Sequence, residues 1–340
     1  MSEGFSVAVV GATGLVGEAM LDCLAARDFP VGDLHLLASG RSAGTAVRYG
    51  DRQCRVAELA GFDFEGVDVA LFSAGGSVSR EHAPRAAAAG AVVIDNTSCF
   101  RYDDDVPLVV PEVNPDALAG YRERNLIANP NCSTIQLVVA LKPIYDAVGI
   151  RRINVATYQS VSGAGRSLVE ELARQTALLL NGQPLGKIST PKQIAFNALP
   201  QIDEFEDNGY TREEMKMVWE TRKILGDNEI GVNATAVRIP VFFGHSEAVH
   251  LETVDKITAD EARKLLKKAP GVSLLDERRA GGYPTAATEA ARDDGVWVGR
   301  IRDDISHDRG LSLWVVADNI RKGAALNSVQ IAEILVKSFW

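Results

Sequence analysis

The sequence predicts an α/β protein of two domains: a Rossmann-type, doubly wound parallel sheet, and a second α+β domain built on a mixed or antiparallel sheet. Three observations predict this fold. Apolar runs alternate with helical patterns up to about residue 130, a glycine-rich turn follows the first apolar run, and long strands with few helices come later. A chain of 340 residues is long enough for two domains with cores of their own. We expect residues 1–131, completed by a C-terminal helix at 319–340, to form the first domain and residues 132–318 the second.

Composition restricts the class of protein and its partners. Hydrophobic residues make up 46% of the chain and charged residues 24%, which is ordinary for a soluble globular protein. The net charge of −9 argues against general nucleic-acid binding, which usually needs a basic face. No apolar run is long enough to span a membrane, and no secretory signal is visible. The four cysteines show no CxxC spacing, so we expect reduced thiols in a cytoplasm, without disulfides or a metal site.

The N-terminal segment carries the pattern of a dinucleotide site. The apolar run Phe5–Val10 predicts a buried strand, the turn GATGLVG follows at 11–17, and a helical pattern continues from Glu18. The glycines, among them Gly11 and Gly14, permit a tight turn and close approach of a pyrophosphate, whose charge a helix N-terminus stabilises. The alternative is a glycine-rich turn that binds no ligand, but the order of strand, turn and helix favours a nucleotide.

The end of the second predicted strand, Leu34–Ala38, indicates which nucleotide binds. NAD-specific Rossmann proteins commonly place an acidic residue near this point to bind the ribose hydroxyls. Here the sequence SGRSAG at 39–44 places Arg41 between two serines, one of which is Ser42. A guanidinium beside hydroxyls suits a 2′-phosphate, so we predict NADP rather than NAD. The alternative is a solvated loop arginine.

Two further strands and a helix complete the predicted parallel sheet. The run Val67–Phe72 predicts a buried strand that ends in small residues at 73–77, and a doubly wound sheet binds its ligand at such strand ends. An alanine-rich helix at 80–89 and a strand at 91–95 follow. This alternation predicts parallel pairing with right-handed crossovers through about residue 130.

Cys132 lies between an extended segment and a helical pattern. Pro130 biases Asn129 away from helical conformation and Asn131 is a favourable N-cap, so we predict a helix that begins at Cys132 or Ser133. A thiol at that place would lie at the positive end of the helix dipole, which favours thiolate. Backbone N–H groups of the first turn would stabilise an oxyanion on a carbonyl that the sulfur attacks. The alternative is a small buried cysteine at a helix start.

Beyond Cys132 the pattern changes to long strands with few helices between them. Apolar residues predict strands at 152–161, 234–243, 247–254, 297–302 and 311–317. Helical patterns occur at 167–180, in a charged surface helix at 211–225, and in a final helix at 324–339 that we expect to return to the first domain. Strands of this kind favour an antiparallel or mixed sheet that is covered on one face.

Two residues of the second domain are candidates for chemistry at a thiol. His245 follows Gly244 near a strand end and is the best candidate base among five histidines, although a single histidine of this kind is often structural. Gln159 lies in a long predicted strand, where its amide would orient a carbonyl or a carboxylate. The alternative for Gln159 is an amide at a strand edge.

Two arginines at the ends of apolar stretches and one charged helix pair are the other polar residues of note. Arg101 and Arg238 each leave an apolar stretch, where a guanidinium usually needs an anionic ligand or a structural salt bridge. Glu220 and Lys223 lie one turn apart on the predicted helix at 211–225. On spacing alone, they are a surface helix pair.

The chain resembles the aspartate-β-semialdehyde dehydrogenases over essentially its full length. NPNCST with a downstream RIPV and GHSEAV, in this order and at this spacing, is the most specific part of the resemblance. The matching motifs are GATGLVG (11–17), SGRSAG (39–44), DNTSCFR (95–101), VPEVN (110–114), NPNCST (129–134), YQSVSGAG (158–165), FNALPQID (196–203), ETRKIL (220–225), VRIPVFFGHSEAV (237–249) and ADN (317–319).

The resemblance implies a role for each matching residue. Cys132 would be the nucleophile that carries the acyl group, His245 the acid and base, and Gln159 the residue that orients the thioester. Arg238 would bind the substrate α-carboxylate and Glu220 its amine, while Arg101 and Lys223 would bind phosphate. The implied NADP contacts are Gly11, Thr13, Gly14, Leu15, Val16, Arg41, Ser42, Ser162, Gly163, Ala164, Gly165 and Asn319.

The implied reaction converts L-4-aspartyl phosphate and NADPH reversibly to L-aspartate-4-semialdehyde, phosphate and NADP+, in the biosynthesis of lysine, threonine, methionine and isoleucine. The resemblance also implies a small-molecule substrate, inorganic phosphate and a homodimer or homotetramer, formed through the second domain. One rival is the sister reaction on an N-acetylated glutamyl phosphate, but an acetylated amine would have no use for Glu220. Another is a non-catalytic homologue that only binds nucleotide, against which the intact set of cysteine, histidine and arginine argues.

Overall fold

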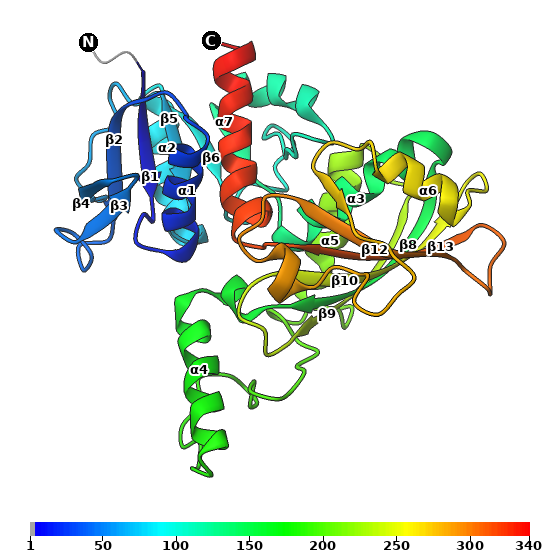
Figure 1. Ribbon diagram of the computed structural model, residues 1–340. Coiled ribbons are helices and arrows are strands. Elements are labelled where there is room, and N and C mark those ends of the chain that lie inside the picture. The colour runs from blue at the N-terminus through cyan, green and yellow to red at the C-terminus, as the bar shows by residue number, and fades with distance from the viewer. Residues whose placement is uncertain (1–3) are drawn as a thin grey trace. The chain divides into compact units, whose positions relative to one another are not determined.

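The computed structural model describes residues 4–340 of the chain (Figure 1). The chain divides into two compact units, which are residues 4–131 with 323–340 (unit 1) and residues 132–322 (unit 2). Within the described residues, no helix has both the length and the apolar composition needed to cross a membrane. The fold class predicted from the sequence, a parallel Rossmann-type sheet and a second domain on a mixed sheet, is confirmed.

Unit 1 is built on a seven-stranded sheet in the order β3-β4-β2-β1-β5-β6-β7, in which every pair is parallel except β3 with β4. Central strands β1, β5 and β6 are buried and almost wholly apolar, as expected for a parallel sheet covered on both faces. The strands are β1 Phe5–Val10, β2 Val31–Ala38, β3 Ala46–Tyr49, β4 Arg52–Glu58, β5 Val69–Phe72, β6 Val92–Asp95 and β7 Leu126–Ala128.

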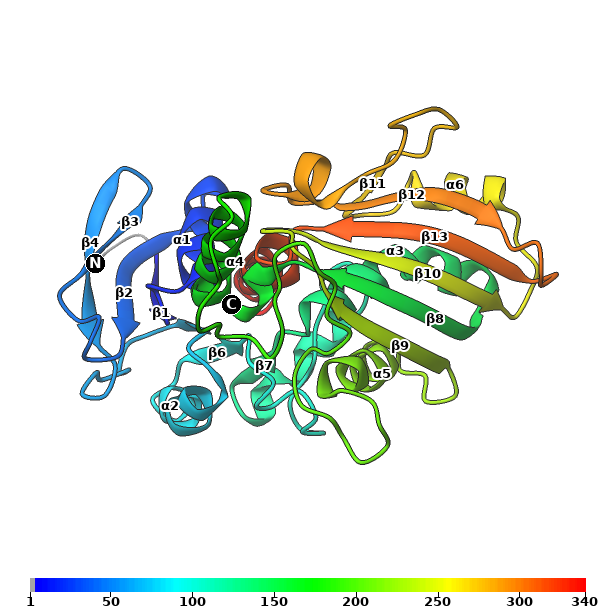
Figure 2. The ribbon, with the colours of Figure 1, turned by 90° about the horizontal axis from the view of Figure 1, so that it is seen from below.

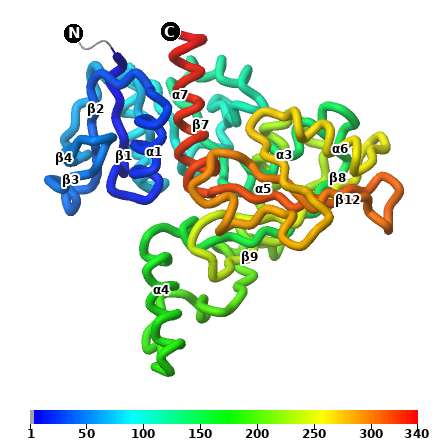
Figure 3. The backbone as a smooth tube through the Cα atoms, in the orientation of Figure 1, coloured from blue at the N-terminus to red at the C-terminus, as the bar shows by residue number. Residues whose placement is uncertain are grey.

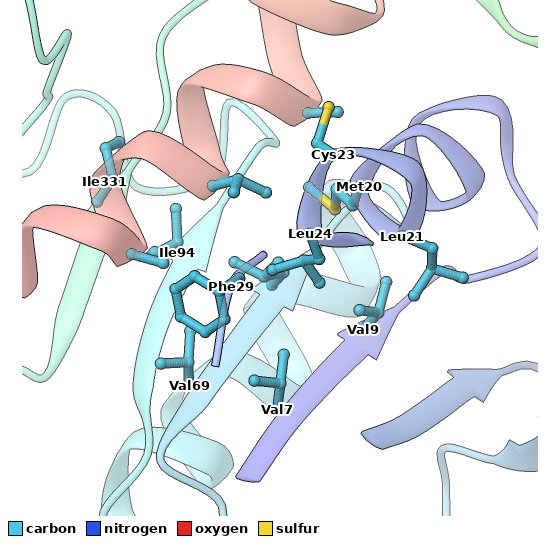
Figure 4. Close-up of a cluster of buried hydrophobic side chains, with 14 of the residues drawn as sticks. Val7, Val9, Met20, Leu21, Cys23, Leu24, Phe29, Val69, Ile94 and Ile331 are labelled. Atoms are coloured by element: carbon cyan, nitrogen blue, oxygen red, sulfur yellow. The ribbon is translucent and has the colours of Figure 1, made fainter. Parts of the chain in front are cut away.

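Helices from both ends of the chain cover this sheet. They are α1 Leu15–Ala26, α2 Gly76–Ala88, a 3-10 helix at Pro115–Glu123 and α7 Leu326–Ser338. Helix α1 packs against α7. Figure 4 shows the core between them, where Met20 and Leu24 of α1, Val9 of β1 and Ile331 of α7 have no exposed surface. The C-terminal helix therefore belongs to the core of the N-terminal sheet.

Unit 2 contains a six-stranded mixed sheet in the order β11-β12-β13-β10-β8-β9 (Figure 2). The pairs β11–β12 and β8–β9 are parallel, and the three pairs between them are antiparallel. The strands are β8 Ile150–Gln159, β9 Gly231–Arg238, β10 His245–Thr253, β11 Val272–Leu274, β12 Val296–Asp303 and β13 Gly310–Ala317.

One face of this second sheet carries helices α3 Cys132–Val148, α5 Arg212–Leu225 and α6 Ala259–Leu266. Helix α4 Arg166–Leu180 extends away from the sheet of unit 2 (Figure 3). The strand residues that face α3, among them Ile153, Val155, Val249 and Leu251, are almost completely buried. The prediction of a mixed sheet covered on one face is thus confirmed.

Several predicted boundaries and elements were wrong. The strand expected at 234–243 ends at Arg238, because Pro240 has no N–H to continue a ladder. Strand β10 begins at His245, whereas the sequence placed its start at Glu247. Helix α5 is not a surface helix, since Glu220 and much of one face are buried. The short elements β3, β4, β11 and α6 were not predicted.

Candidate active site

Cys132 is the first residue of α3, where the sequence predicted a helix to begin. Its side chain is partly exposed, whereas the residues that follow it, from Ser133 to Leu141, are buried. A thiol at this end of a 17-residue helix faces the positive end of the helix dipole. The structure therefore supports an accessible thiol in an electropositive place.

Three polar side chains converge at one end of the second sheet. Gln159 ends β8, Arg238 ends β9 and is its register partner, and His245 begins β10 on the other side of β8. The Nε2 atoms of Gln159 and His245 are 3.4 Å apart, and Arg238 Nη1 donates to the carbonyl of Ser160 at 2.6 Å. All three are buried, which means that sheet register rather than flexible loops holds them.

The hydrogen bonds of His245 define its tautomer. Its Nδ1 accepts from the backbone N–H of Ser160 at 3.1 Å, so in the neutral ring the proton lies on Nε2. Complete burial and the positive charge of Arg238, partly opposed by Glu213, together lower the pKa of His245 to about 3. The imidazole is therefore neutral near pH 7, and its Nε2–H lies beside the amide nitrogen of Gln159, which is itself a donor and cannot accept from it.

Glu213, near the start of α5, was missed by the sequence analysis. Its Oε1 accepts from Gln159 Nε2 at 3.0 Å, and its Oε2 accepts from Lys216 Nζ at 3.0 Å. Lys216 also donates to Asp203 at 2.8 Å. Burial lowers the pKa of the Arg238 guanidinium, while the charges of Glu213 and Cys132 raise it. Glu213 is thus the carboxylate of this group.

Glu220 and Lys223 lie farther along the same helix. Glu220 is completely buried, and Lys223 is half-buried. At 1.5 Å per residue, they are about 10 and 15 Å along the helix axis from Glu213. The side-chain carboxylate that accepts from Gln159 is that of Glu213, and Glu220 lies about two turns farther along α5 among its buried residues. The sequence alone could not distinguish Glu213 and Lys216 from Glu220 and Lys223, because in each pair a basic residue follows an acidic one three positions later.

The turn after β8 lies against the same group. A Cβ added to Gly163 would be 3.0 Å from Arg238 Nη1 and 3.1 Å from His245 Nε2, so a side chain there would force the guanidinium or the imidazole to shift. Asn319 fixes the turn, since its Oδ1 accepts from Ser160 Oγ at 3.0 Å and from the N–H of Gly244 at 2.9 Å. Its Nδ2 donates to the hydroxyl of Ser162, so the predicted segment Ser162–Gly165 and Asn319 do lie together.

In unit 1 the glycine-rich turn has the geometry of a phosphate-binding turn. Gly11 has φ +89°, and a Cβ there would lie 2.6 Å from the carbonyl of Ser73. Gly14 is the N-cap of α1 and has no side chain to occupy the first N–H groups of that helix. The turn is partly exposed, with Thr13, Leu15 and Val16 around it. These features fit a pyrophosphate.

The remaining predicted residues of unit 1 occupy loops after strands. Arg41 is exposed and Ser42 half-buried beyond the end of β2, and no acidic side chain occurs in SGRSAG. Arg101 follows β6 and is buried, with Nε donating to the carbonyl of Asn129 at 2.9 Å and Nη2 to that of Asn96 at 2.7 Å. Within residues 4–340, no group of three or more His, Cys, Asp or Glu side chains is arranged to hold a metal ion.

Two family models match the chain. They are described as the NAD binding domain of semialdehyde dehydrogenase, which matches residues 6–121, and the dimerisation domain of semialdehyde dehydrogenase, which matches residues 141–322. The matches cover most of unit 1 and most of unit 2, in this order.

Curated relatives and solved structures match over the full length. The chain is 63% identical to an aspartate-semialdehyde dehydrogenase of Legionella pneumophila, covering 100% of this chain and 98% of that protein. A crystal structure of aspartate semialdehyde dehydrogenase II from Vibrio cholerae, complexed with ASA, is 59% identical and covers 100% of both chains at a TM-score of 0.97. The structure of such an enzyme from Candida albicans with NADP is 26% identical, covers 98% of both chains and has a TM-score of 0.77.

Proposed function

Because the chain belongs to the aspartate-semialdehyde dehydrogenase family, we propose that its reaction runs through the sulfur of Cys132, with His245, Gln159, Arg238 and Glu213 around the acyl group. The protein is an NADP-dependent oxidoreductase of amino-acid biosynthesis that interconverts L-4-aspartyl phosphate and L-aspartate-4-semialdehyde. The observation that carries the residue assignment is the convergence of three buried polar groups at the ends of β8, β9 and β10.

In the biosynthetic direction the Cys132 thiolate attacks the acyl carbon of aspartyl phosphate. A C–S bond forms, the C–O bond to phosphate breaks, and phosphate leaves with the electron pair. Bound NADPH supplies the hydride that reduces the resulting thioester. The first N–H groups of α3 stabilise the oxyanion, and the protonated imidazole of His245, which the bound substrate favours, donates a proton to give the thiohemiacetal. The imidazole takes that hydroxyl proton back as the C–S bond breaks, which regenerates the thiolate and releases the semialdehyde.

Substrate binding prepares His245 for proton transfer. In the free protein the charge of Arg238 helps to hold the pKa of His245 near 3. When the substrate α-carboxylate pairs with Arg238, it neutralises that charge, and the pKa of His245 rises toward the range useful for an acid and base. The same pairing orients the substrate, so recognition and activation depend on one arginine.

We propose Glu213 as the partner of the substrate amine, with Glu220 as the alternative. Glu213 contacts Gln159 directly and balances Arg238, so a zwitterionic substrate would find a carboxylate and a guanidinium in one group. Lys223 is a proposed phosphate-binding cation, since Lys216 is already paired with the carboxylates of Glu213 and Asp203. Arg101 of unit 1 remains the second proposed phosphate-binding cation.

NADP is proposed to bind on unit 1 at the turn from Gly11 to Val16, with Arg41 and Ser42 toward the 2′-phosphate. The positive φ of Gly11 and the N-cap position of Gly14 support the pyrophosphate site. From unit 2 we propose contacts with Ser162–Gly165 and Asn319, which the hydrogen bonds among Ser160, Ser162 and Asn319 hold in one conformation.

A homodimer through unit 2 is the proposed assembly. The family model that matches unit 2 is that of a dimerisation domain. The sheet face opposite α3 carries Tyr158 and Trp314, whose rings are 5.6 Å apart and partly exposed. A partly exposed aromatic pair on a sheet face is a suitable centre for an interface between copies. Analytical ultracentrifugation of Tyr158→Asp tests this, since dissociation into monomers is expected.

Replacement of the thiol tests the residue assignment. Cys132→Ala is expected to abolish phosphate-dependent NADPH formation, while fluorescence titration shows unchanged NADP binding. Retention of turnover by that variant would contradict the assignment. Assays with aspartate semialdehyde and with N-acetylglutamate semialdehyde distinguish the proposed substrate from its acetylated rival, and activity with neither would favour a non-catalytic homologue.

A further inference from the structure

Arg101 is held by two backbone carbonyls from different strand ends of unit 1. Its Nε donates to the carbonyl of Asn129 at 2.9 Å, and its Nη2 donates to the carbonyl of Asn96 at 2.7 Å. Asn96 follows β6 and Asn129 follows β7. Two bonds to one guanidinium define its plane, so the directions of its other N–H groups depend on where these two carbonyls lie.

Helix α7 binds the side chains of both carbonyl-bearing residues. Asn327 Nδ2 donates to Asn129 Oδ1 at 2.7 Å, and Ser328 Oγ donates to Asn96 Oδ1 at 3.1 Å. Asn327 and Ser328 are adjacent and completely buried. Because successive helical residues point about 100° apart, one turn of α7 reaches the ends of two neighbouring strands.

We propose that Asn327 and Ser328 are positioning residues for Arg101, and that they set the affinity of the enzyme for phosphate. The proposal rests on the proposed role of Arg101 as a phosphate-binding cation. The pair sets the distance between the two carbonyls and thereby the orientation of the guanidinium. A guanidinium binds phosphate through directed N–H bonds as well as through its charge. A less well-oriented guanidinium therefore binds phosphate more weakly although its charge is unchanged.

The surrounding contacts show that the α7 pair is built into the strand ends. Asn327 Nδ2 also donates to the carbonyl of Val109 at 3.0 Å, and Ser328 Oγ also lies 3.0 Å from the carbonyl of Ala324. The backbone N–H of Asn96 donates to the carbonyl of Phe72, and that of Asn129 to the carbonyl of Asp95. The sheet therefore holds each residue through its N–H and the α7 pair holds it through its side chain, so both contacts determine where the carbonyl lies.

Ser328→Ala is the clean test, since it removes one hydroxyl from a buried helix without adding volume. The Michaelis constant for phosphate, measured with the semialdehyde and NADP+, is expected to rise about fivefold, which corresponds to one neutral hydrogen bond. Asn327→Ala, which loses two bonds, is expected to raise it about tenfold. The constants for NADP+ and for the semialdehyde should change less than twofold. Ser338→Ala, the same change at the exposed end of α7, serves as the matched control.

A double-mutant cycle separates this proposal from the function on which it rests. In an Arg101→Lys background, which lacks the planar guanidinium, Ser328→Ala is expected to have no further effect on the Michaelis constant for phosphate. If Arg101→Lys itself leaves that constant unchanged, the proposed role of Arg101 is wrong. If Arg101→Lys raises it but Ser328→Ala has no effect alone, or the same effect in both backgrounds, the positioning role is refuted. Thermal unfolding of each variant identifies a general loss of structure.

Discussion

The choice between Glu213 and Glu220 can be decided by removing one charge at a time. Glu213 accepts from Gln159 at 3.0 Å and from Lys216 at 3.0 Å, and both side chains are largely buried. Glu213→Gln keeps the shape and one acceptor but removes the charge opposite Arg238 and the substrate amine. A hydrogen bond to a charged group contributes about 1.5–3 kcal/mol. A loss of about 2 kcal/mol predicts a roughly 30-fold decrease in kcat/KM for aspartate semialdehyde.

Glu220→Gln is the matched control, since it makes the same change on the same helix about 10 Å away. We expect its kcat/KM to stay within about threefold of the parent. Steady-state kinetics in the oxidative direction, normalised to the concentration of reactive Cys132, measure both variants. A larger loss for Glu220→Gln than for Glu213→Gln, with both proteins folded by thermal melting, would refute the geometric reasoning.

Three further predictions concern charge. Arg41→Glu should raise the Michaelis constant for NADP+ at least tenfold while that for NAD+ falls, and unchanged selectivity in steady-state assays would argue against a 2′-phosphate contact. Because burial and the charge of Arg238 depress the pKa of His245, this base should stay unprotonated as the pH falls from about 8 to 5, and the oxidative kcat/KM should not decline through its protonation. As the pH is lowered, kcat, which reports the substrate-bound state, should decline at a higher pH than kcat/KM does. Complete burial raises the pKa of Glu247 well above its ordinary value. Stability from its neutral form is therefore present below about pH 4.5 and declines as pH rises toward the raised pKa, so Glu247→Gln should stabilise the protein more at pH 8 than at pH 5, as urea denaturation measures.

Local chemistry was sufficient to predict the buried parallel strands of unit 1 and the start of α3. Pro130 and Asn131 indicate a helix start at Cys132, and the structure begins α3 at that residue. The buried strands and the glycine-rich turn likewise depend on nearby residues, so their order could be read along the chain. Short elements such as β11, with three half-buried residues, lack enough periodicity to be recognised.

Contacts between distant residues could not be predicted in the same way. Gln159 and Glu213 are 54 positions apart, and their hydrogen bond depends on how α5 lies on the sheet. Glu213 with Lys216 and Glu220 with Lys223 have the same spacing on one helix, so spacing cannot distinguish them. His245 was predicted near a strand end, but its tautomer depends on the N–H of Ser160, 85 positions away.

The division of unit 1 between the two ends of the chain has a consequence for synthesis. The face of α1 that carries Met20 and Cys23 belongs to the same buried cluster as Leu326, Val329 and Ile331 of α7. During translation all of residues 132–322 emerge before α7 does, so unit 2 can form while the first sheet still exposes that apolar face. A ribosome that stops before residue 326 would release an incomplete nucleotide-binding sheet with an aggregation-prone surface. Helix α7, which is made after unit 2, thus decides whether the first sheet becomes stable.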